Sequence, residues 1–324
     1  MSPSRLLIAA AAGAASALLF AGLVFQSGSA VTLALAAPIP IFIASLGWGS
    51  IAGFVAAIVA AVSVAAISGI VSGGVLLFVA MTLPAAIAGH LVGLARPVDD
   101  AEPEGRRDGF PGLHPAAAGP QLMWYPLERV LFAITMMAAV ACIGLGWYLG
   151  YDVETLKPEI VEALSQSGNA GEMSDIEVEA VAGLLLSLVP VVQPAVLTLT
   201  LGVGLYLAAW VTRISDRLPR PKDDIPSALH LPPMAMFIFV AGLAGLFLPG
   251  TAEHVAAVFC GAFGMAFTFV GLARLHARTR GRSNRGLLLF VSYAAIVILS
   301  FPLVIFTCLG IFDTVGRMRN SSPA

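Results

Sequence analysis

Long stretches of apolar residues alternate with short polar segments along the whole chain. A helix of about 20 residues crosses about 30 Å of hydrocarbon, and each stretch approaches or exceeds that length. The apolar runs are, in chain order, Leu6–Phe25, Val31–Leu46, Ile51–Val71, Val75–Ala95, Leu127–Tyr151, Val181–Val211, Met234–Leu248, Val255–Ala273 and Leu287–Phe312. This pattern predicts an all-α fold, a polytopic integral membrane helix bundle with about eight or nine transmembrane helices.

Two of these runs contain a pair of prolines. Pro38 and Pro40 lie in the second run, and Pro190 and Pro194 lie in the sixth. Proline lacks a backbone N–H and obstructs the carbonyl one turn earlier, so we expect either run to be kinked, broken or partly re-entrant. Carbonyls freed near the middle of a membrane cannot face lipid.

Gln193 stands between Pro190 and Pro194, and its amide offers both a donor and an acceptor. If the sixth run breaks there, Gln193 and the freed carbonyls could bind a polar solute. The alternative is a bent but closed helix whose glutamine bonds to a neighbouring helix. Gln193 is therefore our first ligand-binding candidate.

Composition supports the membrane interpretation and narrows the chemistry. Of 324 residues, 58% are hydrophobic and only 11% charged, against about 25% charged in soluble domains. The chain contains no phosphate-binding loop motif, no zinc-protease or serine-hydrolase motif, and no pair of intramembrane carboxylates. We therefore expect no enzymatic activity, no cofactor, no metal site and no nucleic-acid partner.

The arginines between the runs predict the orientation. Lys and Arg remain on the cytoplasmic side of a membrane. If every run crosses once, the arginines between the runs, from Arg5 to Arg285, share one face with Lys222, and the acidic segment 152–179, with its single lysine, lies on the other. This predicts a multi-pass protein of a bacterial inner membrane, with a cytoplasmic N-terminus and a periplasmic acidic loop. Nine crossings would place Arg317 and Arg319 outside, against the same rule.

The polar segments also suggest a division of the chain. We expect a four-helix membrane part at 1–95 and a flexible cytoplasmic linker at 96–126, rich in Pro, Gly and mixed charge. A second membrane part follows at 127–313, and then a tail at 314–324. In the acidic loop we expect short helices at Val153–Leu164 and Ser174–Ala180, the second opening with a capping box of Ser174 and Glu177.

Two ionisable residues near the ends of apolar runs are further ligand-binding candidates. His90 lies near the cytoplasmic end of the fourth run, and Asp313 directly follows the last. Ionisable residues at membrane depth are costly and often functional. A satisfied histidine and a charge cluster at a helix end are the plain alternatives.

Small residues four positions apart allow helices to approach closely. We expect these pairs to serve helix packing within the bundle or docking of a partner membrane protein or second copy. They are Ala10 with Ala14, Ala17 with Ala21, and Gly49 with Gly53.

Short motifs near both ends of the chain carry a family resemblance: Pro38-x-Pro40, Gly47, Gly49, Gly310-x-x-Asp313 and Arg317. With them, nearly the whole chain resembles the domain of unknown function 2232 family, the YybS-like bacterial membrane proteins. That family is distantly similar to the S components of energy-coupling-factor transporters. The resemblance implies that the four alanines of the first helix dock a coupling subunit. The chain departs from S components in having more than six helices and no clear vitamin-binding signature.

Two functions remain open from the sequence. The first is a transport-related protein that holds a small solute in a cavity within the membrane. The second is a non-transporting scaffold or assembly factor that acts through its loops.

Overall fold

The computed structural model describes residues 2–24, 30–97, 122–166, 174–299 and 301–321, and nearly all of them are helical. The elements are α1 (Pro3–Val24), α2 (Ala30–Leu35), α3 (Pro38–Trp48), α4 (Ser50–Ser68), α5 (Val71–Leu77), the π-helical turn η1 (Phe78–Thr82), α6 (Leu83–Val92), β1 (Ala95–Pro97), β2 (Leu122–Trp124), α7 (Leu127–Leu149), α8 (Val153–Gln166), α9 (Asp175–Ile214), α10 (Ile225–Ala228), α11 (Pro233–Gly245), α12 (Thr251–Arg278), α13 (Arg285–Leu299) and α14 (Pro302–Ser321). The predicted all-α fold is confirmed.

Within the described residues, seven helical spans are long and apolar enough to cross a membrane. The two apolar helices α11 and α13 are shorter. Large apolar side chains are exposed along most of these helices, as a bundle surrounded by lipid requires.

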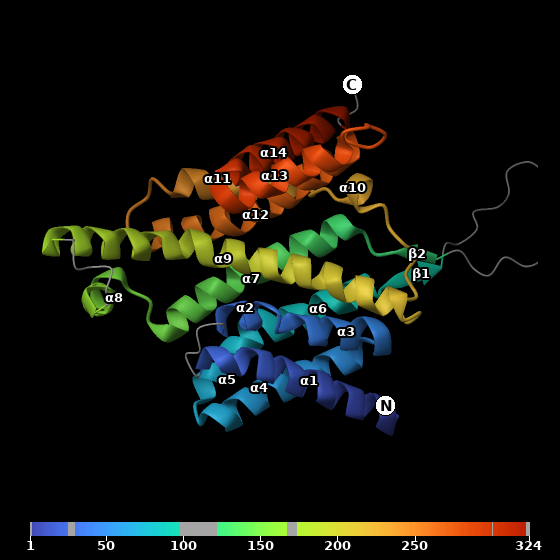
Figure 1. Ribbon diagram of the computed structural model, residues 1–324, viewed down its shortest axis with the longest axis horizontal. Helices are drawn as coiled ribbons and strands as arrows, with labels where there is room; N and C mark the ends of the chain where they lie inside the picture. Colours follow the sequence, from blue (N-terminus) through green and yellow to red (C-terminus); the bar gives the residue numbers. More distant parts are fainter. Residues whose placement is uncertain (1, 25–29, 98–121, 167–173, 300, 322–324) are drawn as a thin grey trace, which may run out of the picture.

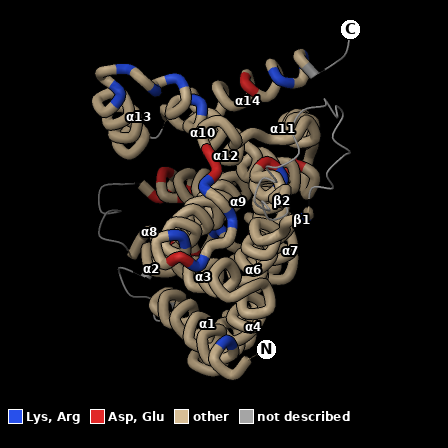
Figure 2. Tube along the Cα trace, turned by 90° about the vertical axis from the view of Figure 1, so that its right-hand side faces the viewer, with Lys and Arg blue, Asp and Glu red and all other residues tan. Residues whose placement is uncertain are grey.

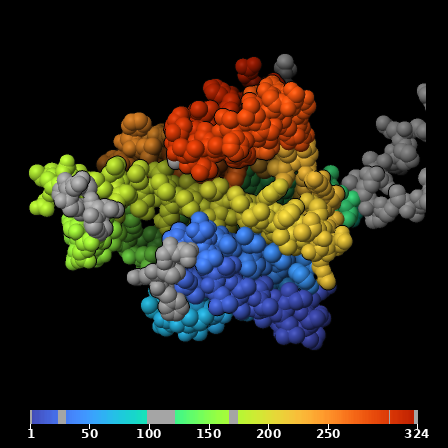
Figure 3. All heavy atoms as spheres, in the orientation of Figure 1, coloured from blue at the N-terminus to red at the C-terminus, as the bar shows by residue number. Residues whose placement is uncertain are grey.

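The long helix α9 lies between two groups of helices (Figure 1). Helices α1 to α6 lie on one side of it and α11 to α14 on the other, which the space-filling view in Figure 3 shows as separate coloured layers. One buried cluster nevertheless joins both groups, since it contains Ala57 of α4, Ala138 of α7, Leu201 of α9 and Ala262 of α12. The core is therefore continuous across the bundle.

The predicted linker begins and ends at one place in the bundle. Its flanks form the antiparallel pair β1 and β2, in which Ala95 lies opposite Trp124. The Tyr125 amide also donates to the Leu94 carbonyl at 2.9 Å. Residues 98–121, most of the predicted linker, lie outside the described residues.

The last apolar run is not the single helix expected over Leu287–Phe312. It forms two helices, because α13 ends at Leu299 and α14 begins at Pro302, a residue that favours the start of a helix. The chain reverses direction between these two helices, so α14 lies beside α12 and runs parallel to it (Figure 1).

Glycines set the spacing of α12 and α14. A Cβ on Gly271 would overlap the Phe306 carbonyl, and one on Gly310 would overlap the Phe267 carbonyl. One turn further on, Arg274 of α12 pairs with Asp313 of α14. The hydrogen bond between Thr268 and Thr307, at 2.7 Å, precedes the Arg274–Asp313 pair along both helices, so the two helices are parallel.

The two proline pairs behave differently. The run with Pro38 and Pro40 is interrupted at Ala36 and Ala37, and the Ser16 hydroxyl donates to the Ala37 carbonyl at the start of α3, at 2.7 Å. The run with Pro190 and Pro194 is continuous, since α9 extends for 40 residues through both prolines. The predicted break near Gln193 is therefore wrong.

A tyrosine explains how α9 tolerates the first of its prolines. Pro190 has no N–H for the Leu186 carbonyl, one turn earlier. The Tyr151 hydroxyl donates to that carbonyl at 2.6 Å. The carbonyl is satisfied without a break in the helix and without a ligand.

The acidic segment is largely helical, as predicted. Helix α8 covers the first predicted helix, and Ser174 with Glu177 forms the predicted capping box. The second predicted helix, however, is the first turns of α9 itself, because the apolar pattern continues without a stop signal. Lys157 of α8 bonds to Glu179 of α9 at 2.8 Å, which attaches α8 to the start of α9.

Candidate functional site

Most of the arginines gather at one end of the bundle, which we call the basic end. It comprises the start of α1, the β1–β2 pair, the segment between α9 and α10, the turn after α12 and the end of α14 (Figure 1). Viewed from this end, Figure 2 shows Lys and Arg distributed over several of these elements. The acidic helix α8 and the start of α9 lie at the opposite end.

Ion pairs hold the basic end together. Arg274 contacts Asp313 at 2.6 Å, and Arg317 contacts the same carboxylate at 3.2 Å. Asp224, beside α10, pairs with Arg280 after α12. Hydrogen bonds from Arg280 and then Ser227 lower the pKa of Asp224 to about 2. Arg317 therefore lies at the same end as Arg274, and the single last crossing that would have separated them is absent.

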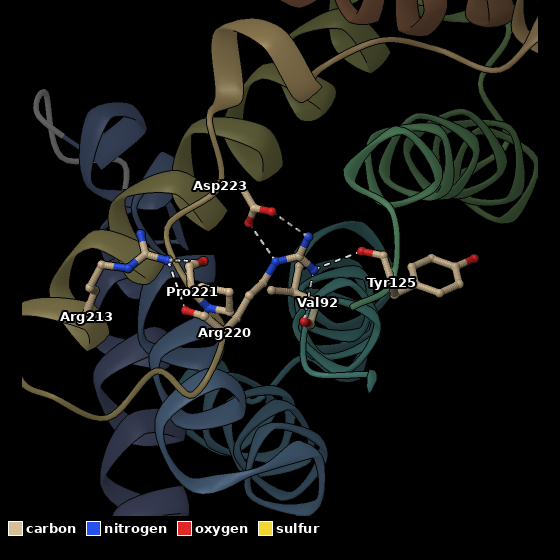
Figure 4. Close-up of polar contacts among 6 residues, drawn as sticks. All are labelled: Val92, Tyr125, Arg213, Arg220, Pro221 and Asp223. Carbon is tan, nitrogen blue, oxygen red and sulfur yellow. Dashed lines mark hydrogen bonds and ion pairs between the residues drawn. The ribbon is translucent and has the colours of Figure 1, made fainter. Parts of the chain in front are cut away.

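Arg220 is the most buried charge at this end, with 5% of its side chain exposed. Its guanidinium donates to both carboxylate oxygens of Asp223, at 2.7 and 3.1 Å. It also donates to the carbonyls of Val92, at the end of α6, and Tyr125, before α7, at 3.3 and 2.8 Å (Figure 4). One side chain thus joins the α9–α10 segment to both ends of the predicted linker.

A pocket of about 350 Å³ opens beside Arg220, and we call it the arginine pocket. It lies between the junction of α3 with α4, the start of α1 and the segment after α9. Among the described residues, its lining includes three arginines and two tryptophans but no carboxylate: Arg5, Arg217, Arg220, Trp48 and Trp124. The arrangement suits a ligand that carries negative charge.

A second pocket of about 440 Å³ adjoins the first and shares Trp124 and Arg220 with it. Its polar lining includes Asp223 and the pair Glu128–His230, whose Oε2 and Nε2 atoms are 2.6 Å apart. Because its carboxylates offset its cations, this pocket does not share the positive character of the arginine pocket.

The structure brings two of the predicted residues to the arginine pocket. His90 bonds through Nδ1 to the hydroxyl of Ser50 at 2.7 Å, and Ser50 lines the pocket. Gly49 lines it as well, at a φ of +99° and a ψ of 163° that only glycine adopts readily. The packing role predicted for Gly49 is wrong, because nothing lies within 4 Å of a Cβ built there.

The other two ligand candidates lie away from both pockets. Gln193 is exposed on α9, where lipid would surround it, and it lines neither pocket. Asp313 lies within α14 and is paired with two arginines, so it belongs to a charge cluster between α12 and α14. Neither residue joins the groups that the arginine pocket brings together.

The four alanines of α1 differ in how far the rest of the bundle covers them. Ala17 and Ala21 are buried within the bundle, Ala10 is half-buried and Ala14 is exposed. The four alanines therefore do not form one open docking face, because half of them are covered by the chain itself. Gly53, by contrast, packs closely against Ser45 of α3, as expected for a small residue where two helices meet.

Sequence reasoning missed Arg217 and Arg220 as members of a site. The run Gly47-Trp48-Gly49-Ser50 was the available signal, because two glycines beside a tryptophan interrupt an otherwise apolar helical pattern. Nothing local indicated that Arg217 would reach Trp48, yet its guanidinium lies 4.9 Å from the centre of that ring.

No family model matches the chain, and no curated protein or solved structure shows a significant match. The family resemblance and the functions it implies therefore remain expectations.

Proposed function

We propose that this is a transport-related protein of a bacterial inner membrane that binds a small anionic solute in the arginine pocket. The observation that carries the proposal is the pocket's lining, in which three arginines and, in the part of the chain that the structure describes, no carboxylate surround about 350 Å³. This differs from the solute site expected near the membrane centre, because both pockets lie at the basic end. The ligand would enter from that side.

The distribution of charge supports a cytoplasmic position for the basic end. The start of α1 and the end of α14 both lie there, so both termini would be cytoplasmic. This arrangement removes the earlier conflict over Arg317 and Arg319. Reporter fusions after Arg319 and within Arg213–Leu231 should both report a cytoplasmic location, and a fusion within Asp152–Gln166 a periplasmic one. A periplasmic signal after Arg319 would contradict the topology.

Ligand-dependent melting of the purified protein tests the binding function. A ligand that binds only the native state raises the melting temperature by mass action. Anionic, neutral and cationic metabolites of similar size should be compared in maltoside detergent. We expect stabilisation by anions alone, and its loss in Arg217→Gln. Equal stabilisation by neutral compounds, or none by any compound, would contradict the proposal.

A further inference from the structure

We propose that the arginine pocket recognises the phosphate group of an organic phosphate ester. This inference rests on the proposed function, because it names the chemical class of the anion. The evidence is the convergence of three kinds of polar group on one cavity: helix amides, guanidinium groups and a hydroxyl group that a histidine positions.

The first donors come from the start of α4. The first amides of a helix have no partner within it, and they attract anions. Gly49 precedes the helix and provides no side-chain cap, so the amides of Ser50 and Ile51 are not covered by a capping group. Both Gly49 and Ser50 line the pocket, and the space beside Gly49 is open. A phosphate oxygen can therefore approach the backbone closely.

The arginines provide the charge. In the part of the chain that the structure describes, Arg5 and Arg217 have no carboxylate partner, whereas Arg220 is paired with Asp223. Arg217 is held over the ring of Trp48, which restricts its guanidinium beside the start of α4. Guanidinium groups bind phosphate through paired hydrogen bonds. Two positive charges thus remain for the ligand.

Ser45 lies beneath the pocket and packs between the helices around it. The residue is 4% exposed, and its hydroxyl lies between Gly53 and Gly89, one helical turn below the lining residues Gly49 and Gly93. This hydroxyl therefore belongs to the contact of α3 with α4 and α6 and does not face the ligand.

His90 positions a hydroxyl that does line the pocket. When Nδ1 carries the ring proton, His90 donates to the Ser50 oxygen, and the Ser50 O–H is free to donate to the ligand. His90, one of the ligand-binding candidates from the sequence, is then a positioning residue that orients the Ser50 hydroxyl and does not contact the ligand itself.

The shape of the pocket favours an ester over inorganic phosphate. Its volume exceeds that of a single phosphate ion, and Trp48 and Trp124 line the remaining space with apolar surface. A phosphate ester of this kind is either a soluble metabolite or a phospholipid headgroup. Both present the same group to the arginines, so experiment must separate the two sources.

Binding to the full-length protein in phosphate-free maltoside detergent tests the inference. Glycerol 3-phosphate represents the soluble source, and phosphatidylglycerol, with phosphatidylcholine as its neutral counterpart, represents the lipid source. We expect saturable binding of at least one of the two anionic probes. Arg217→Gln should weaken that binding by about tenfold, as expected for loss of a charged hydrogen bond. The matched control is Arg278→Gln, which removes an exposed arginine at the same end but outside the pocket and should leave affinity unchanged.

The outcomes separate this inference from the proposed function. If sulfate and citrate bind as tightly as glycerol 3-phosphate and depend equally on Arg217, anion binding stands and phosphate recognition is overturned. If no anion depends on Arg217, both are overturned. If Arg217→Gln does not fold, Arg5→Gln gives the same test, because Arg5 lies in the exposed first turn of α1. Equal weakening by Arg278→Gln would show nonspecific attraction and overturn the site.

Discussion

The middle of the bundle and its basic end are held together by different interactions. In the middle, helices approach until backbone atoms touch, as where Gly261 of α12 meets the Val191 carbonyl of α9. At the basic end, helices stop or turn, and Arg220 connects their ends through hydrogen bonds to backbone carbonyls. The two adjoining pockets lie at the basic end and are lined by residues at helix ends and in the segments that connect them.

The difference between these two regions follows from what surrounds them, which is lipid around the middle of the bundle and water at its ends. Helices in lipid gain little from burying apolar surface, so they associate through close packing of small residues. Water reaches the bundle ends, where charged groups and unpaired helix termini cost less. The proposed binding site accordingly lies where the helices end, and the site expected near the membrane centre would have required a broken helix that α9 does not provide.

The largest expected effect comes from disturbing the packed middle. Gly271→Ala should lower the free energy of unfolding by about 3 kcal/mol, the upper end for overpacking, because its Cβ would overlap the rigid Phe306 carbonyl. The measurement is the thermal midpoint in detergent. Gly316→Ala is the control, because Gly316 is at an exposed position of α14 with open space around it, and the change should be neutral or slightly stabilising. Equal loss in both variants would show that α12 and α14 do not cross closely.

At the basic end, removing the central arginine should have the next largest effect. Arg220→Gln leaves the Val92 and Tyr125 carbonyls and Asp223 without their donor, at a cost of about 2–3 kcal/mol. Lys222→Gln removes an exposed charge from the same segment and should change stability little. Chemical denaturation of both variants provides the comparison. A cost for Arg220→Gln no greater than that for Lys222→Gln would mean that Arg220 does not hold these segments together.

A double-mutant cycle examines the proline in α9. Tyr151→Phe removes the donor to the Leu186 carbonyl and should cost about 1 kcal/mol. In a Pro190→Ala background the restored N–H can serve that carbonyl, so the cost of Tyr151→Phe should fall. Tyr148→Phe, at an exposed position of α7, is the control. An unchanged cost in the two backgrounds would show that the tyrosine does not compensate for the proline.

The smallest expected effect is a pH dependence at the basic end. Arg280 and Ser227 hold the pKa of Asp224 at about 2, below its ordinary value of 3.8. Because this pKa is lowered, the Asp224–Arg280 pair stabilises the fold fully above pH 3.8, and the stabilisation is lost as the pH falls toward 2. The effect is small because both side chains are nearly half exposed. The melting-temperature difference between the wild-type protein and Asp224→Asn should shrink across that window, and a difference that grows would contradict the assignment.

Local rules in the sequence determined much of this protein. The length of the apolar runs predicted the all-α bundle, the arginine spacing predicted one basic end, and the Ser174–Glu177 spacing predicted a helix start. Each of these features depends on residues within one or two helical turns, or on the composition of one segment. They could therefore be recognised before any contact was known.

Only the tertiary structure decided where helices break and where a ligand could fit. Pro190 does not interrupt α9 because Tyr151, 35 residues before the carbonyl it serves, supplies the missing hydrogen bond. The last apolar run divides at Pro302, which is a local signal, but only the tertiary structure shows that α14 then packs against α12 through Gly271 and Gly310. The arginine pocket assembles Arg5, Ser50 and Arg217 from three separate segments, and no local pattern encodes a meeting of residues so distant along the chain.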